Sequence, residues 1–158
     1  MSDMEGFDAF YESPVGWLGI QLQGDSLSQI SWFNQRKPQI SQHKATPLVK
    51  AVTDTLDAYF RSSAVTQRFT YCLEGTSFQQ RVWRALQDIP PGTVKTYGEL
   101  AAELNTSSRA IGQACKRNPI SILIPCHRVV AAKGIGGYMG GTRKTHIKQW
   151  LLQHEGIH

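Results

Sequence analysis

Residues 96–117, TYGELAAELNTSSRAIGQACKR, contain two short helical patterns joined by a polar turn. The first helix is expected to open at Thr96, because Thr96 and Glu99 have the spacing of a capping box. Polar residues 105–107 would form the turn, and a second helix is expected over 108–117. Two short helices joined by a tight polar turn are typical of a helix-turn-helix.

A cysteine and a histidine follow this pair of helices. The Asn-Pro dipeptide at 118–119 should end the second helix, and the apolar run 120–124 is expected to be extended and buried. The next residues, 125–129, read PCHRV. A cysteine is a strong nucleophile near neutral pH, although Cys126 taken alone would more often be a buried core residue. In an extended chain, Cys126 and His127 would point to opposite faces and would not hydrogen-bond directly.

The N-terminal part of the chain is predicted to form a β-meander followed by a helix. Thr46-Pro47 supplies an N-cap and a proline at the first helical position. Another helix should begin at the capping box of Thr76 and Gln79 and end before Pro90. The expected strands are 7–11, 17–22 and 27–33, with 69–71 as a candidate fourth, and Cys72 is expected to be buried.

The C-terminal part alternates between glycine-rich and helical sequence. Residues 131–141 hold many glycines and should form a loop or hairpin, because no strand and helix flank them in the order of a dinucleotide-binding fingerprint. A final helix is predicted over 142–154, with Ile147, Trp150 and Leu151 facing the core.

Length and composition indicate a globular protein with one domain or two small ones. The chain has 158 residues, of which 41% are hydrophobic and 18% charged. It has no apolar run long enough to span a bilayer and no signal-peptide pattern, so a cytoplasmic location is expected. The three cysteines, Cys72, Cys115 and Cys126, match neither a disulfide framework nor a zinc motif, and no metal is expected.

The net charge of +5 is distributed unevenly along the chain. Residues 1–74 carry six Lys and Arg against eight Asp and Glu, whereas residues 75–158 carry eleven against four. The second half is therefore a candidate surface for a polyanion such as nucleic acid, with a solubilising basic face as the alternative. Its basic residues are Arg81, Arg84, Lys95, Arg109, Lys116, Arg117, Arg128, Lys133, Arg143, Lys144 and Lys148.

Several of these motifs, in this order, resemble the O6-alkylguanine-DNA alkyltransferases (methylated-DNA–protein-cysteine methyltransferases), in particular bacterial members. The resemblance covers 76–156 and is weaker over 1–71. The residues that carry it are Arg109-Ala110-Ile111-Gly112, Asn118-Pro119, Pro125-Cys126-His127-Arg128-Val129, Tyr138-x-Gly140-Gly141 and Trp150-Leu151-Leu152-x-His154-Glu155-Gly156.

The resemblance implies a fold and an activity. The expected fold is α/β plus α, with a ribonuclease-H-like α/β domain over 1–74 and a winged helix-turn-helix domain over 75–158. The implied activity is transfer of an alkyl group from guanine O6 in double-stranded DNA to the protein's own cysteine, with thymine O4 as a second candidate position. This transfer occurs once and irreversibly. The protein is expected to be a monomer that needs no cofactor.

The resemblance also assigns catalytic roles. Cys126 is the acceptor, His127 is the base that reaches it through a water, and Glu155 orients His127. Asn118 is implied to tie the recognition helix to the active-site turn, and Tyr97 to donate to the departing guanine.

Guanine is implied to be read by the Val129 carbonyl and the Met139 backbone N–H, with Tyr138 lining the pocket. Met139 stands where the family is associated with Ser or Ala. Some relatives bind zinc in the N-terminal domain, but no cysteine precedes Cys72 to support such a site here.

The target base must leave the helical stack, and Arg109 is implied to fill the space that it vacates. The small residues around Arg109 match a helix pressed into the minor groove. The remaining DNA contacts are expected from Ser108, Gln113, Lys116 and Arg117.

Three other functions stay open from the residues. An alkyltransferase-like protein binds the lesion but lacks the acceptor cysteine, whereas Cys126 is present here. A helix-turn-helix regulator would not need the PCHRV turn. A Cys-His hydrolase would leave the DNA-binding helix unexplained.

Overall fold

The computed structural model describes residues 6–33, 46–65, 69–138 and 144–157. Contacts between Cα atoms divide the chain into two compact units. The first contains residues 1–73 and 119–121, and the second contains 74–118 and 122–158. The predicted boundary at 74/75 lies beside this division, but residues 119–121 had been placed in the second domain.

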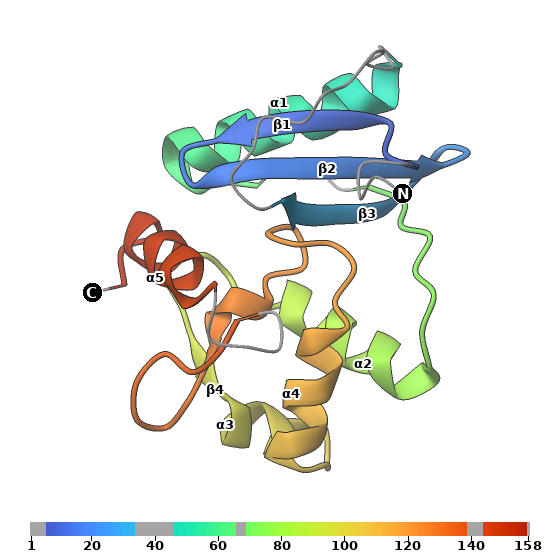
Figure 1. Cartoon of the computed structure of the whole chain (residues 1–158). Coiled ribbons are helices and arrows are strands. Elements are labelled where there is room, and N and C mark those ends of the chain that lie inside the picture. The colour runs from blue at the N-terminus through green and yellow to red at the C-terminus, as the bar shows by residue number, and fades with distance from the viewer. Residues whose placement is uncertain (1–5, 34–45, 66–68, 139–143, 158) are drawn as a thin grey trace. The chain divides into compact units, whose positions relative to one another are not determined.

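The first unit is a three-stranded antiparallel sheet with one helix (Figure 1). The strands β1 (Ala9–Ser13), β2 (Gly16–Gln23) and β3 (Ser26–Phe33) follow one another as the predicted meander. Helix α1 (Pro47–Ser62) begins at the predicted N-cap, where the Thr46 hydroxyl accepts from the Val49 N–H. Its buried face consists of Val49, Val52, Thr55, Leu56 and Tyr59.

Two short segments pair with β3. Leu27 exchanges backbone hydrogen bonds with Thr70 and Cys72, and Ile30 exchanges them with Pro119 and Ser121. The predicted strand at 69–71 is therefore a single bridge, between Leu27 and Tyr71. The Cys72 side chain is only partly buried, so the expectation of a core cysteine was wrong.

The second unit starts with helix α2 (Ser77–Gln87) and contains the predicted helix-turn-helix pair. Strand β4 (Lys95–Thr96) leads into α3 (Tyr97–Glu103), and α4 (Ser108–Lys116) follows the turn. Both predicted capping boxes are confirmed, at Thr76 and at Thr96. The buried Trp83 indole N–H donates to the Ala114 carbonyl and joins α2 to α4 at 2.9 Å.

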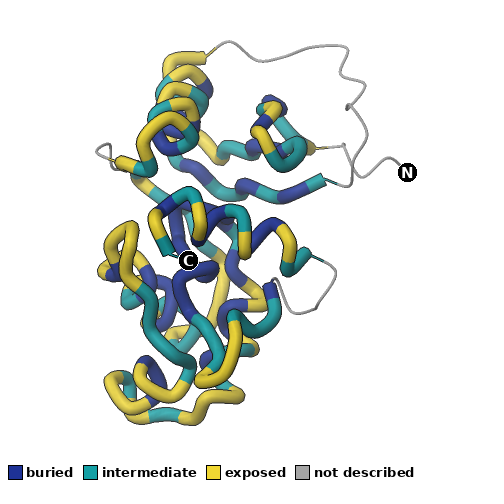
Figure 2. The backbone as a smooth tube through the Cα atoms, turned by 90° about the vertical axis from the view of Figure 1, so that its left-hand side faces the viewer, coloured by how far each residue is buried: buried dark blue, intermediate teal, exposed yellow. Residues whose placement is uncertain are grey.

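The rest of the second unit is a tightly buried turn and a final helix. The turn is a 3₁₀ helix, η1 (Cys126–Arg128), followed by β5 (Val129–Val130), which pairs in parallel with β4. Helix α5 (Thr145–His154) is the last helix of the described chain. Residues 122–129 are all buried. Figure 2 draws buried residues in dark blue, and such stretches lie in the interior of this unit.

The apolar run before the turn is buried as predicted, but it is not extended over its whole length. Residues 121–123 form a turn, and Ile122 adopts a left-handed φ of 72°. A β-branched residue is strained in this region, which the sequence pattern could not reveal. In α5, Ile147 and Leu151 face the core as predicted, but Trp150 is half-buried and stacks on His154.

Candidate active site

Cys126, His127 and Arg128 form one turn of 3₁₀ helix in which all three side chains are buried. The Arg128 N–H donates to the Pro125 carbonyl at 3.0 Å and closes the turn. The chain is therefore not extended at Cys126 and His127, so the expectation that neighbours in extended chain point to opposite faces does not apply here. The turn directs three neighbouring side chains, one nucleophilic and two basic, into the interior of the second unit.

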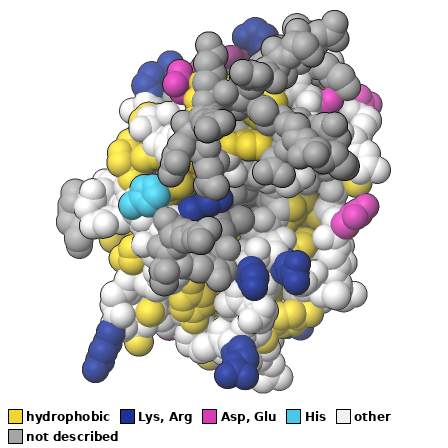
Figure 3. Space-filling model, in the orientation of Figure 1, with side chains coloured by type: hydrophobic (Ala, Val, Ile, Leu, Met, Phe, Trp, Pro, Cys, Tyr) yellow, Lys and Arg dark blue, Asp and Glu magenta, His cyan; other side chains and the backbone are white. Residues whose placement is uncertain are grey.

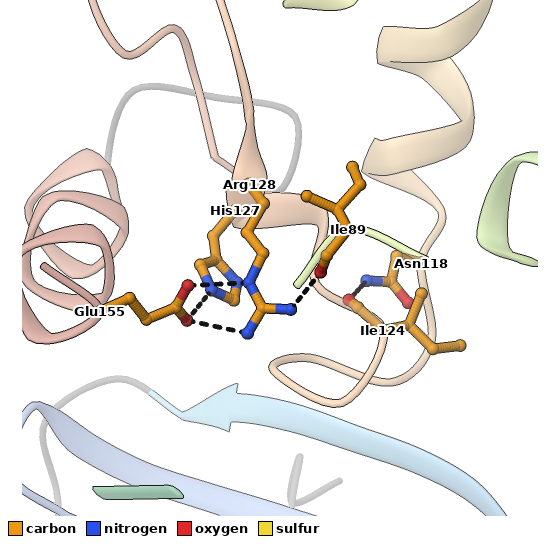
Figure 4. A network of polar contacts seen from close by, with 6 residues as sticks. All are labelled: Ile89, Asn118, Ile124, His127, Arg128 and Glu155. Atoms are coloured by element: carbon orange, nitrogen blue, oxygen red, sulfur yellow. Dashed lines mark hydrogen bonds and ion pairs between the residues drawn. The ribbon is translucent and has the colours of Figure 1, made fainter. Parts of the chain in front are cut away.

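The Glu155 carboxylate joins His127 and Arg128 (Figure 4). Its Oε2 lies 2.6 Å from His127 Nε2, and the Arg128 guanidinium donates to both oxygens, at 2.8 and 3.1 Å. Arg128 also donates to the Ile89 carbonyl beyond the end of α2, at 2.6 Å. Burial alone would raise the pKa of Glu155, but the hydrogen bonds from His127 and Arg128 outweigh burial and lower it to about 2.

The ionised Glu155 fixes the tautomer of His127. A carboxylate can only accept hydrogen bonds, so His127 donates through Nε2–H and keeps a lone pair on Nδ1. Nδ1 is buried and has no hydrogen-bond partner among the described residues. Burial lowers the pKa of His127 despite the nearby carboxylate. His127 is therefore a neutral imidazole whose unoccupied nitrogen can accept a proton.

Cys126 is a thiol that needs such a base. The residue is 4% exposed, and burial raises the pKa of its thiol. A hydrogen bond from the Asn118 side chain, the charge of Lys148 and the backbone N–H of Cys126 act in the opposite direction. Three groups thus stabilise the thiolate once it forms, but burial keeps the resting sulfur protonated.

Asn118 lies between α4 and the turn. Its side-chain Nδ2 donates to the Ile124 carbonyl at 2.7 Å, and both residues are buried (Figure 4). Its backbone N–H donates to the Cys115 carbonyl in the last turn of α4. One residue therefore contacts both elements that the sequence analysis expected it to join.

The structure describes three of the residues that were predicted to contact guanine, namely Tyr97, Val129 and Tyr138. Tyr97 begins α3 and is half-buried, and burial together with the charges of Cys115 and Cys126 raises its pKa to about 12. Val129 is fully buried at the start of β5, and Tyr138 is also buried. Met139 lies outside the described residues.

The predicted DNA-binding residues lie on one helix. Ser108, Arg109, Gln113, Lys116 and Arg117 are all exposed, on α4 or directly after it, whereas Ile111, Ala114 and Cys115 form its buried face. A Cβ on Gly112 would meet no atom within 4 Å. Figure 3 shows separate Lys and Arg side chains over the region of α3 and α4, at the bottom of the view. This face of α4 is polar, basic and open.

Two basic residues of the site were missed. Arg128 and Lys148 were counted with the basic surface, yet they are 5% and 0% exposed. The available signals were the position of Arg128 beside His127 and the spacing of Lys148 between Ile147 and Leu151 on the buried face of α5. Charged residues are rarely buried without partners, so a surface location was the ordinary expectation.

Within the described ranges, no three His, Cys, Asp or Glu side chains gather in a way that could hold a metal ion. In the same ranges, no helix has both the length and the apolar character needed to cross a membrane.

The site thus combines a buried thiol, a neutral imidazole and a carboxylate with an exposed basic helix. This combination indicates the class of proteins that use a cysteine for their chemistry and bind nucleic acid. Residues 77–157 match the family described as 6-O-methylguanine DNA methyltransferase, DNA binding domain. The methylated-DNA–protein-cysteine methyltransferase of Salmonella typhimurium is 46% identical over 160 residues, covering 91% of this chain and 92% of the relative. The chain belongs to the methylated-DNA–protein-cysteine methyltransferase family.

Solved structures agree with this assignment. The crystal structure of Mycobacterium tuberculosis O6-methylguanine methyltransferase has a TM-score of 0.76 at 37% identity, covering 93% of this chain and 90% of that one. A crystal structure of the Mycobacterium tuberculosis protein in complex with DNA also has a TM-score of 0.76 at 37% identity, with 93% and 91% covered. The mixed α/β fold is that of these structures.

Proposed function

We propose that this chain repairs double-stranded DNA by transferring an alkyl group from guanine O6 to its own Cys126. The transfer occurs once per molecule. The observation that carries the proposal is the buried Cys126–His127–Glu155 arrangement in a chain of this family. The relative crystallised with DNA supports DNA as the partner.

The reaction starts with the thiol proton. It passes from Cys126 through a water to His127 Nδ1, and the Glu155 carboxylate stabilises the imidazolium that results. The thiolate attacks the sp³ carbon of the alkyl group. The S–C bond forms as the C–O6 bond breaks, and the electron pair of that bond leaves with guanine. The product is a thioether, and because a thiolate is a poor leaving group from an alkyl carbon, the transfer is irreversible.

Tyr97 assists the departing guanine. The raised pKa of its hydroxyl keeps it protonated near neutral pH, so that it can donate a hydrogen bond. Such a bond lowers the negative charge that develops on the base in the transition state. The Val129 carbonyl and the Met139 N–H read the guanine edge, and Tyr138 lines the pocket.

The base reaches the sulfur after rotating out of the duplex, at a cost of a few kcal/mol. Arg109 fills the space left in the stack, and α4 enters the minor groove. The other exposed α4 residues contact phosphates and sugars, which carry no sequence information. A protein that scans for rare lesions needs this kind of binding.

We also infer the fold of each unit. The meander with α1 fits a ribonuclease-H-like domain, and α3–α4 with the small β4–β5 sheet fits a winged helix-turn-helix.

The proposed acceptor, base and carboxylate all belong to one chain, so the transfer needs no partner subunit and the working unit is a monomer. O4-alkylthymine presents the same alkyl–oxygen bond and is a second candidate substrate.

The test is incubation with an oligonucleotide duplex carrying O6-methylguanine, followed by mass spectrometry of the intact protein and its peptides. We expect a gain of one methyl group on the peptide holding Cys126. Cys126→Ala should keep duplex binding and lose transfer, while the control Cys72→Ala transfers normally. Binding without a mass gain would favour a lesion-binding protein, and repeated turnover would contradict the proposal.

Arg109→Ala tests the base-flipping step. It should slow transfer from duplex more than reaction with free O6-alkylguanine, because only the duplex substrate requires the vacated space to be filled. Equal losses on both substrates would argue against this role.

A further inference from the structure

A lysine inside the second unit has no carboxylate partner among the described residues. Lys148 is 0% exposed and lies on the buried face of α5. A buried ammonium that lacks compensation costs several kcal/mol. The groups around Lys148 therefore need to supply that compensation, and their identity indicates what the residue does.

Among the described residues, three groups lie close to the Lys148 ammonium, and two of them, on Val129 and Tyr97, belong to the proposed guanine site. Nζ donates to the Val129 carbonyl at 2.7 Å and to the Gly137 carbonyl at 2.8 Å. It also lies 5.6 Å from the centroid of the Tyr97 ring, within the range of a cation–π interaction. Tyr97 is confined on another side, because a Cβ on Gly136 would lie 3.2 Å from its ring.

The Val129 carbonyl has two lone pairs, and Lys148 uses one of them. In the proposed function, the other lone pair would accept from the guanine edge. A carbonyl held in this way can be approached by the base from a restricted range of directions. Lys148 would thus influence the position of the guanine edge. The position of the alkyl carbon relative to the Cys126 sulfur depends on that edge.

The charge of Lys148 also reaches the nucleophile. It lowers the pKa of the Cys126 thiol, against the effect of burial. Burial lowers the pKa of Lys148 itself to about 8, while Cys126 and Cys115 raise it. The titratable groups that interact with Lys148 are Cys115 on α4, Cys126 and His127 on η1, and Tyr97 on α3.

We propose that Lys148 is a positioning residue whose buried ammonium holds the Val129 carbonyl and the Tyr97 ring in place and stabilises the Cys126 thiolate. The inference rests on the proposed function, because it assigns a further residue to the same transfer. The two roles can be separated, since one depends on the hydrogen bonds of the ammonium and the other on its charge.

The charge role is tested with iodoacetamide on the full chain, following alkylation of the Cys126 peptide as a function of pH. Lys148→Met removes both the charge and the donors, while Lys148→Gln removes the charge but keeps an N–H donor. Both should move the midpoint to higher pH and slow alkylation at neutral pH about tenfold, the effect of one pKa unit. Lys144→Met, one turn earlier, is the control and should leave the midpoint unchanged. An unchanged midpoint in both Lys148 variants would overturn the charge role.

The hydrogen-bonding role is tested by single-turnover transfer from methylated duplex at a pH above the thiol midpoint of each variant. Thiol ionisation no longer limits the rate there, so Lys148→Met should remain slower than Lys148→Gln. Equal rates for both variants and the unmodified chain would remove this role. If the unmodified chain failed to place methyl on Cys126, the proposed function itself would be wrong.

A third measurement needs no substitution and covers the case in which a variant fails to fold. Coupling between two sites is reciprocal, so a thiolate that Lys148 stabilises must also stabilise the Lys148 ammonium. NMR titration of ¹³C-labelled lysine in the unmodified chain should give a lower midpoint for Lys148 after Cys126 is methylated. The same midpoint before and after methylation would overturn the proposal.

Discussion

At the residue scale, the proposed transfer depends on a neutral His127 whose Nδ1 has no hydrogen-bond partner among the described residues. His127→Gln should slow transfer at neutral pH by about 10²- to 10⁴-fold, the usual contribution of a general base. The difference in transfer rate between the unmodified chain and His127→Gln should become smaller as pH rises, because the Cys126 thiol then ionises without a base. Single-turnover rates measured across pH, with exposed His146→Gln as control, provide the test. A ratio that stays constant with pH would mean that His127 does not act as a base.

Beside its proposed catalytic role, Glu155 has a structural one, because it is the anion that pairs with the buried Arg128 guanidinium. Glu155→Gln leaves the buried Arg128 guanidinium without its anion, and should lower the free energy of unfolding by about 3–5 kcal/mol. The control Glu103→Gln breaks the exposed ion pair with Lys95 and should cost at most about 1 kcal/mol. Urea unfolding of both variants measures the contrast, and similar losses would mean that burial of the pair is not decisive.

The same carboxylate predicts how stability changes with acid. Folding lowers the pKa of Glu155 from 4.5 to about 2, so its contribution is complete above the higher value and is lost as pH falls toward the lower one. The difference in unfolding free energy between the unmodified chain and Glu155→Gln should therefore shrink over this interval. A difference that stays constant from pH 5 to pH 2 would contradict the assignment of the charge.

At the element scale, α4 carries a glycine that only an approaching partner would require. A Cβ on Gly112 meets nothing, so Gly112→Ala should stabilise the protein by about 0.5–1 kcal/mol. The added methyl group should nevertheless weaken duplex binding, because it holds the helix away from the DNA. Thermal unfolding and binding titrations measure the two effects. Gly98→Ala in α3 is the control for the gain in stability, and unchanged duplex affinity of Gly112→Ala would exclude close approach at this point.

The helices were predictable because their signals are local. The capping boxes at Thr76 and Thr96 use residues three apart, and both form as expected. The 3₁₀ turn at 126–128 was not predictable in this way, because the contacts that hold it come from Ile89, Asn118 and Glu155. The sequence identified Cys126, His127 and Glu155 through a family resemblance, whereas periodicity alone would have left them unassigned.

At the scale of the whole molecule, unequal charge distribution suggested a polyanion partner. Arg128 and Lys148 do not belong to the basic surface of residues 75–158, because both are buried. The exposed residues that remain should still neutralise roughly 4–6 phosphates, so that the logarithm of duplex affinity falls against the logarithm of salt concentration with a slope of about −4 to −5. Lys116→Ala should reduce the slope by about one, whereas Lys50→Ala in the first unit should not change it. Affinity that is insensitive to salt would exclude the basic face.

The division of the chain is less simple than its sequence order. Residues 119–121 pair with β3 and belong to the first unit, although residues on both sides of them belong to the second. Local patterns cannot reveal such an exchange, since it depends on hydrogen bonds between Ile30 and residues some ninety positions away. Positions 119–121 were therefore assigned by sequence order alone.

The amide of Asn118 has a mechanical consequence. Asn118 is the second residue after α4, and its side chain donates a hydrogen bond to the carbonyl of Ile124, two residues before Cys126. Because this hydrogen bond joins the end of α4 to the segment before Cys126, we expect a shift of α4 to move the nucleophile as well. Asn118→Ala would remove this connection. The variant should still bind duplex, but binding would no longer affect the position of the Cys126 thiol.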